Sequence, residues 1–186
     1  MTQSKTNHTA VRALCEGAIM VALATILSLF RLFQLPQGGS VNLGMLPIFI
    51  YCCRWGWKQS VLTALAYGLL QIVVDGASGW GLVCILLDYI LAFTVLSTAS
   101  LFNRMKGGIY IGVTVACVLR FVCHFISGVT AFRILAPTEL FNTTFTNPYI
   151  YAAAYNGSFL AIDLALCLVI LALLRVPLKK QLTVQG

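Results

Sequence analysis

The chain has 186 residues, of which 60% are hydrophobic and only 9% are charged, and its mean hydropathy is +0.92. A soluble domain carries about 25% charged residues to keep its surface hydrated, so the composition excludes an ordinary soluble fold and predicts an integral membrane protein. A membrane-spanning helix needs about 20 apolar residues, which leaves room for at most about six or seven spans.

Six apolar segments follow one another along the chain and predict an all-α membrane protein with six transmembrane helices. They cover approximately residues 11–33, 41–53, 58–75, 81–103, 108–132 and 150–176. The second is short for a straight crossing, so we expect it to be tilted or extended by the loop before it. We expect a cytoplasmic tail at 1–10, one membrane domain at 11–180 and a second cytoplasmic tail at 181–186.

The net charge of +7 reflects membrane topology rather than binding of nucleic acid, because the basic residues stand in ones and twos between apolar segments instead of forming one stripe. If the N-terminus is cytoplasmic, nine of the twelve basic residues face the cytoplasm. They are Lys5, Arg12, Arg54, Lys58, Arg104, Lys106, Arg175, Lys179 and Lys180. Arg31 and Arg133 remain outside, and Arg120 lies within a span. The positive-inside rule therefore predicts that both termini are cytoplasmic.

Sequence signatures of catalysis and of metal binding are absent. The seven cysteines show no CxxC spacing, which argues against a zinc site and a disulfide framework. The chain has no HExxH, GxSxG or GxxxxGK[ST] motif. We therefore expect no catalytic residue, metal or cofactor, and no ATP hydrolysis by this chain.

Ionisable residues within the spans mark a candidate site, because a charge in lipid is costly and is expected to face the protein interior. Asp88, followed by Tyr89, lies in the fourth span, and Arg120 and His124 share one face of the fifth. Asp163 lies in the sixth span. The structural alternative is that Asp88 and Arg120 neutralise each other across a helix interface.

The depth of these residues favours a binding pocket. Asp88, Tyr89, His124, Tyr151 and Asn156 should all lie in the outer half of the bilayer. Two unusual outer loops lie above them, a glycine-rich segment at 35–44 that could act as a lid and an aromatic segment at 136–149. The pattern predicts an outward-facing pocket for a ligand with a planar ring, hydrogen-bonding groups and positive charge.

Four stretches of sequence carry a resemblance to a known family. They are Gly38-Gly39-Ser40-Val41-Asn42-Leu43-Gly44-Met45-Leu46-Pro47-Ile48, Leu87-Asp88-Tyr89, Arg120 to Gly128 with His124, and Tyr151-Ala152-Ala153-Ala154-Tyr155-Asn156-Gly157. From about Arg12 to Lys180, the chain resembles the thiamine-specific substrate-binding subunits (S-components) of energy-coupling factor (ECF) transporters, which import vitamins into bacteria. The resemblance implies a protein of the bacterial cell membrane that binds thiamine with high affinity beneath its first loop. It also implies two kinds of partner, a transmembrane coupling subunit and two ATPase subunits.

The resemblance also implies which residues hold the ligand, and these are Asp88, Tyr89, His124, Gly128, Tyr151 and Asn156. Asp88 would accept hydrogen bonds from the aminopyrimidine or offset the thiazolium charge. Some members carry Glu at the position of Asp88. Some also carry a Trp in the final outer loop, where Phe132 is the nearest aromatic residue here. Trp80 could compensate for that Trp, and Arg120 is a further candidate. These departures leave a thiamine precursor or another vitamin open as the ligand.

The coupling subunit of this family contacts small residues on the first helix, which the resemblance places at Ala18 and Ala22. Small residues allow helices to approach closely in lipid, although packing within this chain would explain them too. A stand-alone secondary transporter is the alternative function. It predicts inverted repeats or broken helices, and the sequence shows neither.

Overall fold

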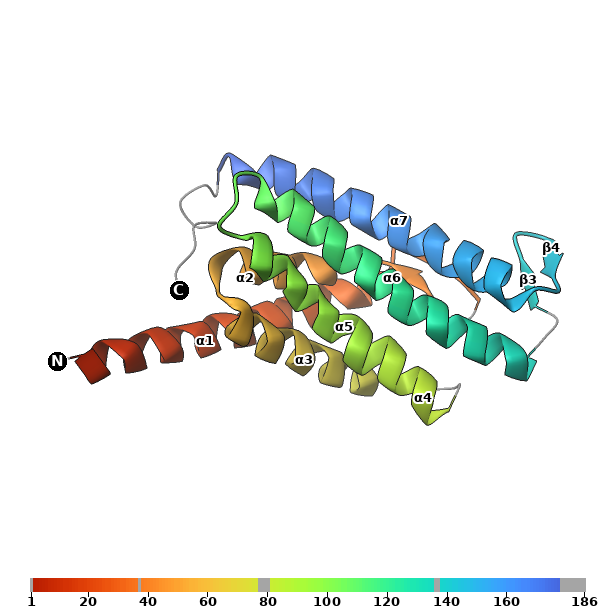
Figure 1. The fold of residues 1–186 in the computed structure, drawn as a ribbon, viewed down its shortest axis with the longest axis horizontal. Coiled ribbons are helices and arrows are strands. Elements are labelled where there is room, and N and C mark those ends of the chain that lie inside the picture. Colours follow the sequence, from red (N-terminus) through yellow and green to blue (C-terminus); the bar gives the residue numbers. More distant parts are fainter. Residues whose placement is uncertain (1, 37, 77–80, 136–137, 178–186) are drawn as a thin grey trace.

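The computed structural model describes residues 2–36, 38–76, 81–135 and 138–177, apart from the side chains of 2–7 and 132–138. Over these ranges the chain folds into six helical rods (Figure 1). The first three are α1 (Thr2–Leu29), α2 (Met45–Arg54) and α3 (Trp57–Val74), and the last two are α6 (Gly108–Leu135) and α7 (Pro148–Arg175). The fourth rod is continuous and consists of α4 (Leu82–Ile85), η1 (Leu86–Leu91), α5 (Ala92–Thr94) and η2 (Val95–Phe102). Two antiparallel hairpins pair β1 (Phe33–Gln34) with β2 (Ser40–Val41) and β3 (Thr138–Leu140) with β4 (Thr143–Phe145).

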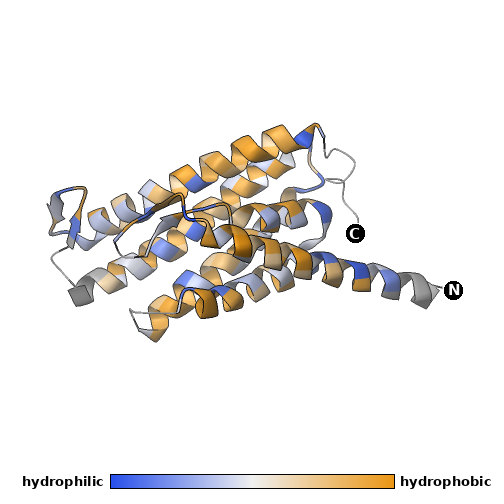
Figure 2. Cartoon of the chain, turned by 180° about the vertical axis from the view of Figure 1, so that it is seen from behind, coloured by the Kyte–Doolittle hydropathy of each residue, from blue (hydrophilic) through white to orange (hydrophobic). Residues whose placement is uncertain are grey.

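The all-α fold is confirmed, and the helices after α1 lie close to their predicted apolar segments, whereas α1 begins nine residues before its segment and ends four residues before the segment's end. Four helical stretches in the described ranges are long and apolar enough to cross a bilayer, at His8–Leu29, Leu82–Phe102, Gly108–Ala131 and Pro148–Arg175. The α2 helix has only ten residues, and α1 begins within the expected tail at 1–10. The helices are coloured as hydrophobic along much of their length in Figure 2, and many large hydrophobic side chains are exposed, which fits a lipid environment.

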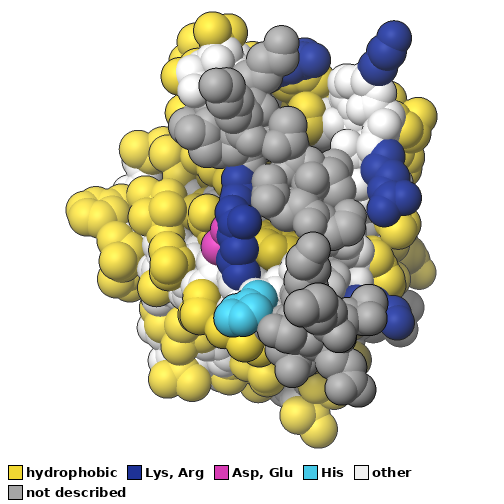
Figure 3. Space-filling view, turned by 90° about the vertical axis from the view of Figure 1, so that its left-hand side faces the viewer, with side chains coloured by type: hydrophobic (Ala, Val, Ile, Leu, Met, Phe, Trp, Pro, Cys, Tyr) yellow, Lys and Arg dark blue, Asp and Glu magenta, His cyan; other side chains and the backbone are white. Residues whose placement is uncertain are grey.

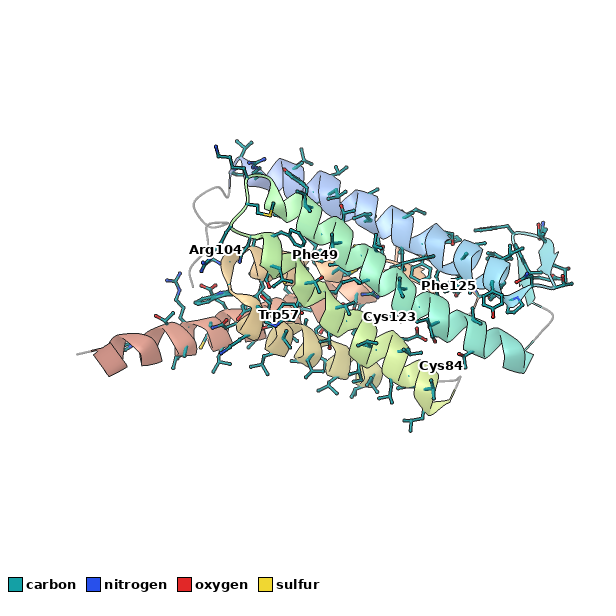
Figure 4. The ribbon with its side chains drawn as sticks, viewed as in Figure 1. Phe49, Trp57, Cys84, Arg104, Cys123 and Phe125 are labelled. Carbon is teal, nitrogen blue, oxygen red and sulfur yellow. The ribbon has the colours of Figure 1, made fainter. Side chains whose placement is uncertain are left out.

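The two ends of the bundle differ in charge. The start of α1, the end of α7 and the α2–α3 and η2–α6 connections lie at one end (Figure 1). Figure 3 looks toward that end and shows Lys and Arg side chains on it, and Figure 4 labels Arg104 there. The carboxylate of Glu16 is neutralised there, because it accepts hydrogen bonds from Arg54 at 3.0 and 3.1 Å and from Trp55 Nε1 at 2.8 Å. These contacts fix α1 against the end of α2.

The fourth rod departs from α-helical geometry where it carries the expected acidic residue. Leu86–Leu91 forms a π-helical turn, and Val95–Phe102 forms a 3₁₀ helix. Gly68 of α3 lets this rod approach closely, since a Cβ at Gly68 would lie 2.5 Å from the backbone oxygen of Tyr89. Single π turns within helices occur frequently at functional sites. The distortion therefore directs attention to the side chains of Asp88 and Tyr89.

Candidate functional site

A cavity of about 470 Å³ lies in the half of the bundle away from the start of α1, between α3, η1, α6, α7 and the first loop. Figure 4 locates this region through Cys84 on α4 and through Cys123 and Phe125, the sequence neighbours of His124 on α6. Seven of the predicted site residues line the cavity, namely Asp88, Tyr89, Arg120, His124, Gly128, Tyr151 and Asn156. Trp80 and the side chain of Phe132 lie outside the described residues.

Asp88 is bound to α6 through both of its carboxylate oxygens. His124 Nδ1 lies 2.6 Å from Asp88 Oδ1, and Ser127 Oγ donates to Asp88 Oδ2 at 2.5 Å. The alternative ion pair between Asp88 and Arg120 does not form among the described contacts. His124 also lines the cavity, and its Nε2 has no hydrogen-bond partner among the described residues.

Asn156 and Gly128 hold α7 and α6 together at the cavity wall. Asn156 Nδ2 donates to the backbone oxygens of His124 at 3.1 Å and of Ala152 at 2.9 Å. A Cβ at Gly128 would lie 2.9 Å from Asn156 Nδ2 and 3.1 Å from the Cβ of Ala152. Glycine at 128 therefore allows the close helix contact that positions both Asn156 and His124.

Further polar side chains also line the cavity. Gln71 Nε2 donates to the hydroxyl of Tyr67 at 2.7 Å, and the Arg120 guanidinium lies over the Phe93 ring at 4.2 Å. Asp163 Oδ1 accepts from the backbone N–H of Asn42 at 3.0 Å. Gln71, Tyr67, Phe93 and Ser127 were not among the predicted site residues. Tyr67 and Gln71 are four residues apart and so share one helix face, and this spacing could have indicated that their side chains interact.

The first loop folds over the cavity as the β1–β2 hairpin. The backbone N–H of Gly39 donates to the hydroxyl of Tyr155 at 2.8 Å, and Leu35 and Val41 are buried. At the rim, Arg31 pairs with Asp75 at 2.9 Å across the ends of α1 and α3. The predicted lid segment is thus attached to α7, and the ion pair beside it joins the ends of α1 and α3.

The charged side chains that line the cavity sum to a small negative charge. Two are basic, Arg31 and Arg120, and three are acidic, Asp75, Asp88 and Asp163, which gives 2 − 3 = −1. Aromatic rings of Tyr89, Tyr151, Tyr155 and Phe159 complete the wall. The arrangement suits a small aromatic cation with several hydrogen-bonding groups.

Comparisons with known proteins agree with this geometry. The family model for thiamine transporter proteins matches residues 14–183. The chain belongs to this thiamine transporter family. It is 34% identical to the thiamine transporter ThiT of Bacillus subtilis (strain 168), in an alignment that covers 87% of this chain and 88% of that protein. It also shares its fold with ThiT from Listeria monocytogenes, with a TM-score of 0.81 at 20% identity over 94% of this chain and 98% of the other.

Membership of this family shows which class of protein the chain belongs to. The chain is a multi-pass membrane protein of a bacterial type, and it is a transport protein rather than an enzyme. The predicted resemblance to thiamine S-components is confirmed. The role of each cavity residue stays a prediction.

Proposed function

We propose that the chain binds thiamine in this cavity and delivers it to an ECF-type importer as its substrate-binding subunit. One observation carries the proposal. Within the described ranges, the buried side-chain polar atoms without a hydrogen-bond partner are Gln71 Oε1, Arg120 Nε and Nη1, and His124 Nε2. All three residues line the cavity. Buried polar groups are normally paired, so these atoms are best explained by a polar ligand that supplies their partners.

Charge and shape both favour thiamine as that ligand. The net lining charge of −1 is complementary to the single positive charge of a thiazolium ring. We assign this role to Asp88, whose carboxylate is fixed by His124 and Ser127 and lines the same cavity as Tyr89 and Tyr151. The cavity volume lies in the range of small-molecule sites, roughly 300–1,000 Å³.

The membrane orientation follows from the charge at the two ends of the bundle. We propose six spans, both termini in the cytoplasm and the cavity open to the outside, with 1–10 and 181–186 as cytoplasmic tails. The basic end of the bundle supports this orientation (Figure 3). Since α2 is short, the β1–β2 hairpin before it would occupy the rest of that crossing.

A groove on the outside of the bundle supports docking of the coupling subunit. Ala18 and Ala22 are exposed on α1 and face Leu62 and Ala66 of α3 across a groove of about 600 Å³. Its lining is largely apolar and rich in small residues, which allows a partner helix to approach the backbone closely. The partner would be a transmembrane coupling subunit. Two ATPase subunits would supply the energy, since this sequence has no phosphate-binding loop of its own.

Isothermal titration of the detergent-solubilised protein with thiamine tests the ligand and the cavity together. Asp88→Asn removes the charge nearest to the proposed thiazolium and leaves an amide N–H group facing His124 or Ser127. A charge pair about 5 Å apart at an effective dielectric constant of about 20 contributes roughly 3 kcal/mol, so we expect weakening of at least ~10-fold. Asn156→Ala should also weaken binding, because it releases the backbone of α6.

Glu139→Gln is the matched control, because it makes the same carboxylate-to-amide change at an exposed position on β3. We expect it to bind thiamine as the unmodified protein does. Folded protein that gives no heat with thiamine would refute thiamine as the ligand, and binding would then be measured with thiamine precursors. Equal affinity of Asp88→Asn and Glu139→Gln would refute the role of Asp88.

A further inference from the structure

The first loop, between the end of α1 at Leu29 and the start of α2 at Met45, lies at the depth of the membrane. Glu16 of α1 binds Arg54 and Trp55 at the basic end of the bundle. Leu29 follows Glu16 by 13 residues, which is a rise of ~20 Å in a helix. Met45 begins the ten residues of α2, so it lies ~15 Å from the same end. Both heights are smaller than the ~30 Å thickness of the hydrocarbon core.

Two contacts with α7 give the same depth for the loop. The backbone N–H of Asn42 donates to Asp163 Oδ1 at 3.0 Å, and Asp163 lies near the middle of α7. The backbone N–H of Gly39 donates to the hydroxyl of Tyr155 at 2.8 Å. Tyr155 follows Pro148, the first residue of α7, by seven residues or ~10 Å. The loop therefore lies below the outer end of α7, beside the transmembrane part of the bundle.

The exposed side chains of this loop are divided by polarity. Among its described residues, the exposed polar side chains are Arg31 and Gln34, and both line the cavity. The exposed large apolar side chains are Phe30, Leu32 and Phe33, at 68%, 66% and 52%, and none of them lines the cavity. The loop thus has a polar inner face and an apolar outer face, which is the reverse of what a lid surrounded by water requires.

The apolar outer face follows directly after an apolar stripe on α1. Ile19, Leu23, Ile26 and Leu29 are exposed and lie three or four residues apart, so they share one side of the helix. In a multi-pass membrane protein such a stripe faces lipid. Phe33 comes four residues after Leu29 and continues the exposed apolar surface beyond the end of the helix.

The backbone of the loop is adapted to a medium without water. Backbone polar groups at membrane depth must be paired within the protein, and irregular backbone is tolerated there where it lines a cavity. Two acceptors for the loop are supplied by α7, as described above. Within 3.1 Å of protein acceptors lie the backbone N–H groups of Leu32, Leu35, Gly38, Gly39, Asn42 and Gly44.

We propose that the outer face of the lid is a lipid-contact surface, on which acyl chains of the outer leaflet pack against Phe30, Leu32 and Phe33. The lid is then a re-entrant segment of the membrane domain, with one face toward the polar cavity and the other toward hydrocarbon. Opening of the cavity on this side displaces acyl chains instead of water. The proposal rests on the six-span orientation proposed above and does not require thiamine as the ligand.

Spin labels on the lid test this surface directly. Phe33→Cys and Phe30→Cys are each made in the full-length protein carrying Cys15→Ser, because Cys15 is exposed and the other six cysteines are buried. The labelled proteins are reconstituted into phosphatidylcholine nanodiscs without thiamine. Power saturation in electron paramagnetic resonance then measures how often each label collides with oxygen, which concentrates in hydrocarbon, and with a polar nickel chelate, which stays in water.

Two reference positions calibrate the measurement. Leu23→Cys reports the lipid-facing stripe of α1, and Glu139→Cys reports an exposed position on β3. We expect the oxygen-to-chelate collision ratio at Phe33→Cys and Phe30→Cys to match that at Leu23→Cys. It should exceed the ratio at Glu139→Cys by at least ~10-fold, since polar solutes partition poorly into hydrocarbon.

The outcomes separate the lid from the proposed function. A ratio at Phe33→Cys nearer to that of Glu139→Cys than to that of Leu23→Cys would overturn the proposal, because water would then cover the lid. Should Phe33→Cys not fold, Phe30→Cys decides by the same criterion. An aqueous ratio at Leu23→Cys would refute the orientation and the lid surface together. Failure of the unmodified protein to bind thiamine would refute the proposed ligand and leave the lid result unchanged.

Discussion

The glycine at the α6–α7 contact provides a sharp test of how the helices position the ligand. In Gly128→Ala, the new Cβ would lie 2.9 Å from Asn156 Nδ2 and 3.1 Å from the Cβ of Ala152. The Ala152 methyl has no torsion that could move it away, and Asn156 is held by hydrogen bonds to His124 O and Ala152 O. Overpacking of this kind costs about 1–3 kcal/mol. The better helix propensity of Ala returns about 1 kcal/mol, so a net loss of about 1 kcal/mol is expected.

Gly157→Ala is the matched control one residue beyond Asn156, because its Cβ would meet only Phe121 Cε2, at 3.8 Å. It should raise the melting temperature in detergent by a few degrees, as helix propensity alone predicts. Gly128→Ala should lower it and should weaken thiamine binding by roughly tenfold, since the backbone oxygen of His124 and the amide of Asn156 must separate. If Gly128→Ala is stabilised as much as Gly157→Ala and binds thiamine normally, the close packing does not position the site.

Two further predictions concern the rim and the outer groove. Asp75→Asn removes the rim ion pair with Arg31, whose side chains are about one-third exposed. Thiamine should then dissociate several-fold faster in stopped-flow measurements, and any salt dependence of the dissociation rate should diminish. An unchanged dissociation rate would contradict a role of this ion pair in closing the lid. Ala22→Trp fills the α1–α3 groove, so it should abolish co-purification with the coupling subunit and cellular thiamine uptake while leaving the thiamine affinity unchanged. Normal uptake would exclude this groove as the docking surface.

Much of the fold could be predicted because lipid imposes simple rules on the sequence. Continuous apolar runs identified the helical rods, and the ends of α3 and α7 differ from their predicted positions by only one or two residues. Counting along the helices placed Asp88, His124 and Asn156 at a common depth, and the structure places all three on one cavity. Rare polar residues within apolar helices thus carried most of the information about the site.

The features that the sequence did not reveal depend on packing between helices. The π-helical turn at Leu86–Leu91 contains neither Pro nor Gly, so no residue within it marks the distortion. The close approach of Gly68 to Tyr89 belongs to a different helix. Gln71 was missed because an uncharged amide near the end of a span is common at a membrane interface. Its hydrogen bond to Tyr67 uses the amide nitrogen and leaves the carbonyl oxygen without a partner among the described residues, which only the structure could show.

The unpaired atoms of the cavity also connect ligand binding to the rigidity of the bundle. Gln71 lies on α3, Asp88 on η1, Arg120 and His124 on α6, and Asn156 on α7. A ligand that contacts all of them joins four helical rods around the cavity. Binding should therefore stabilise the bundle as a whole, because each buried group that gains a partner no longer opposes folding. The first loop would share in this effect, since Asn42 is attached to Asp163 at the base of the same cavity. A closed lid and a rigid bundle would then both result from occupancy of the cavity, and the occupied protein would present a single shape to a coupling partner.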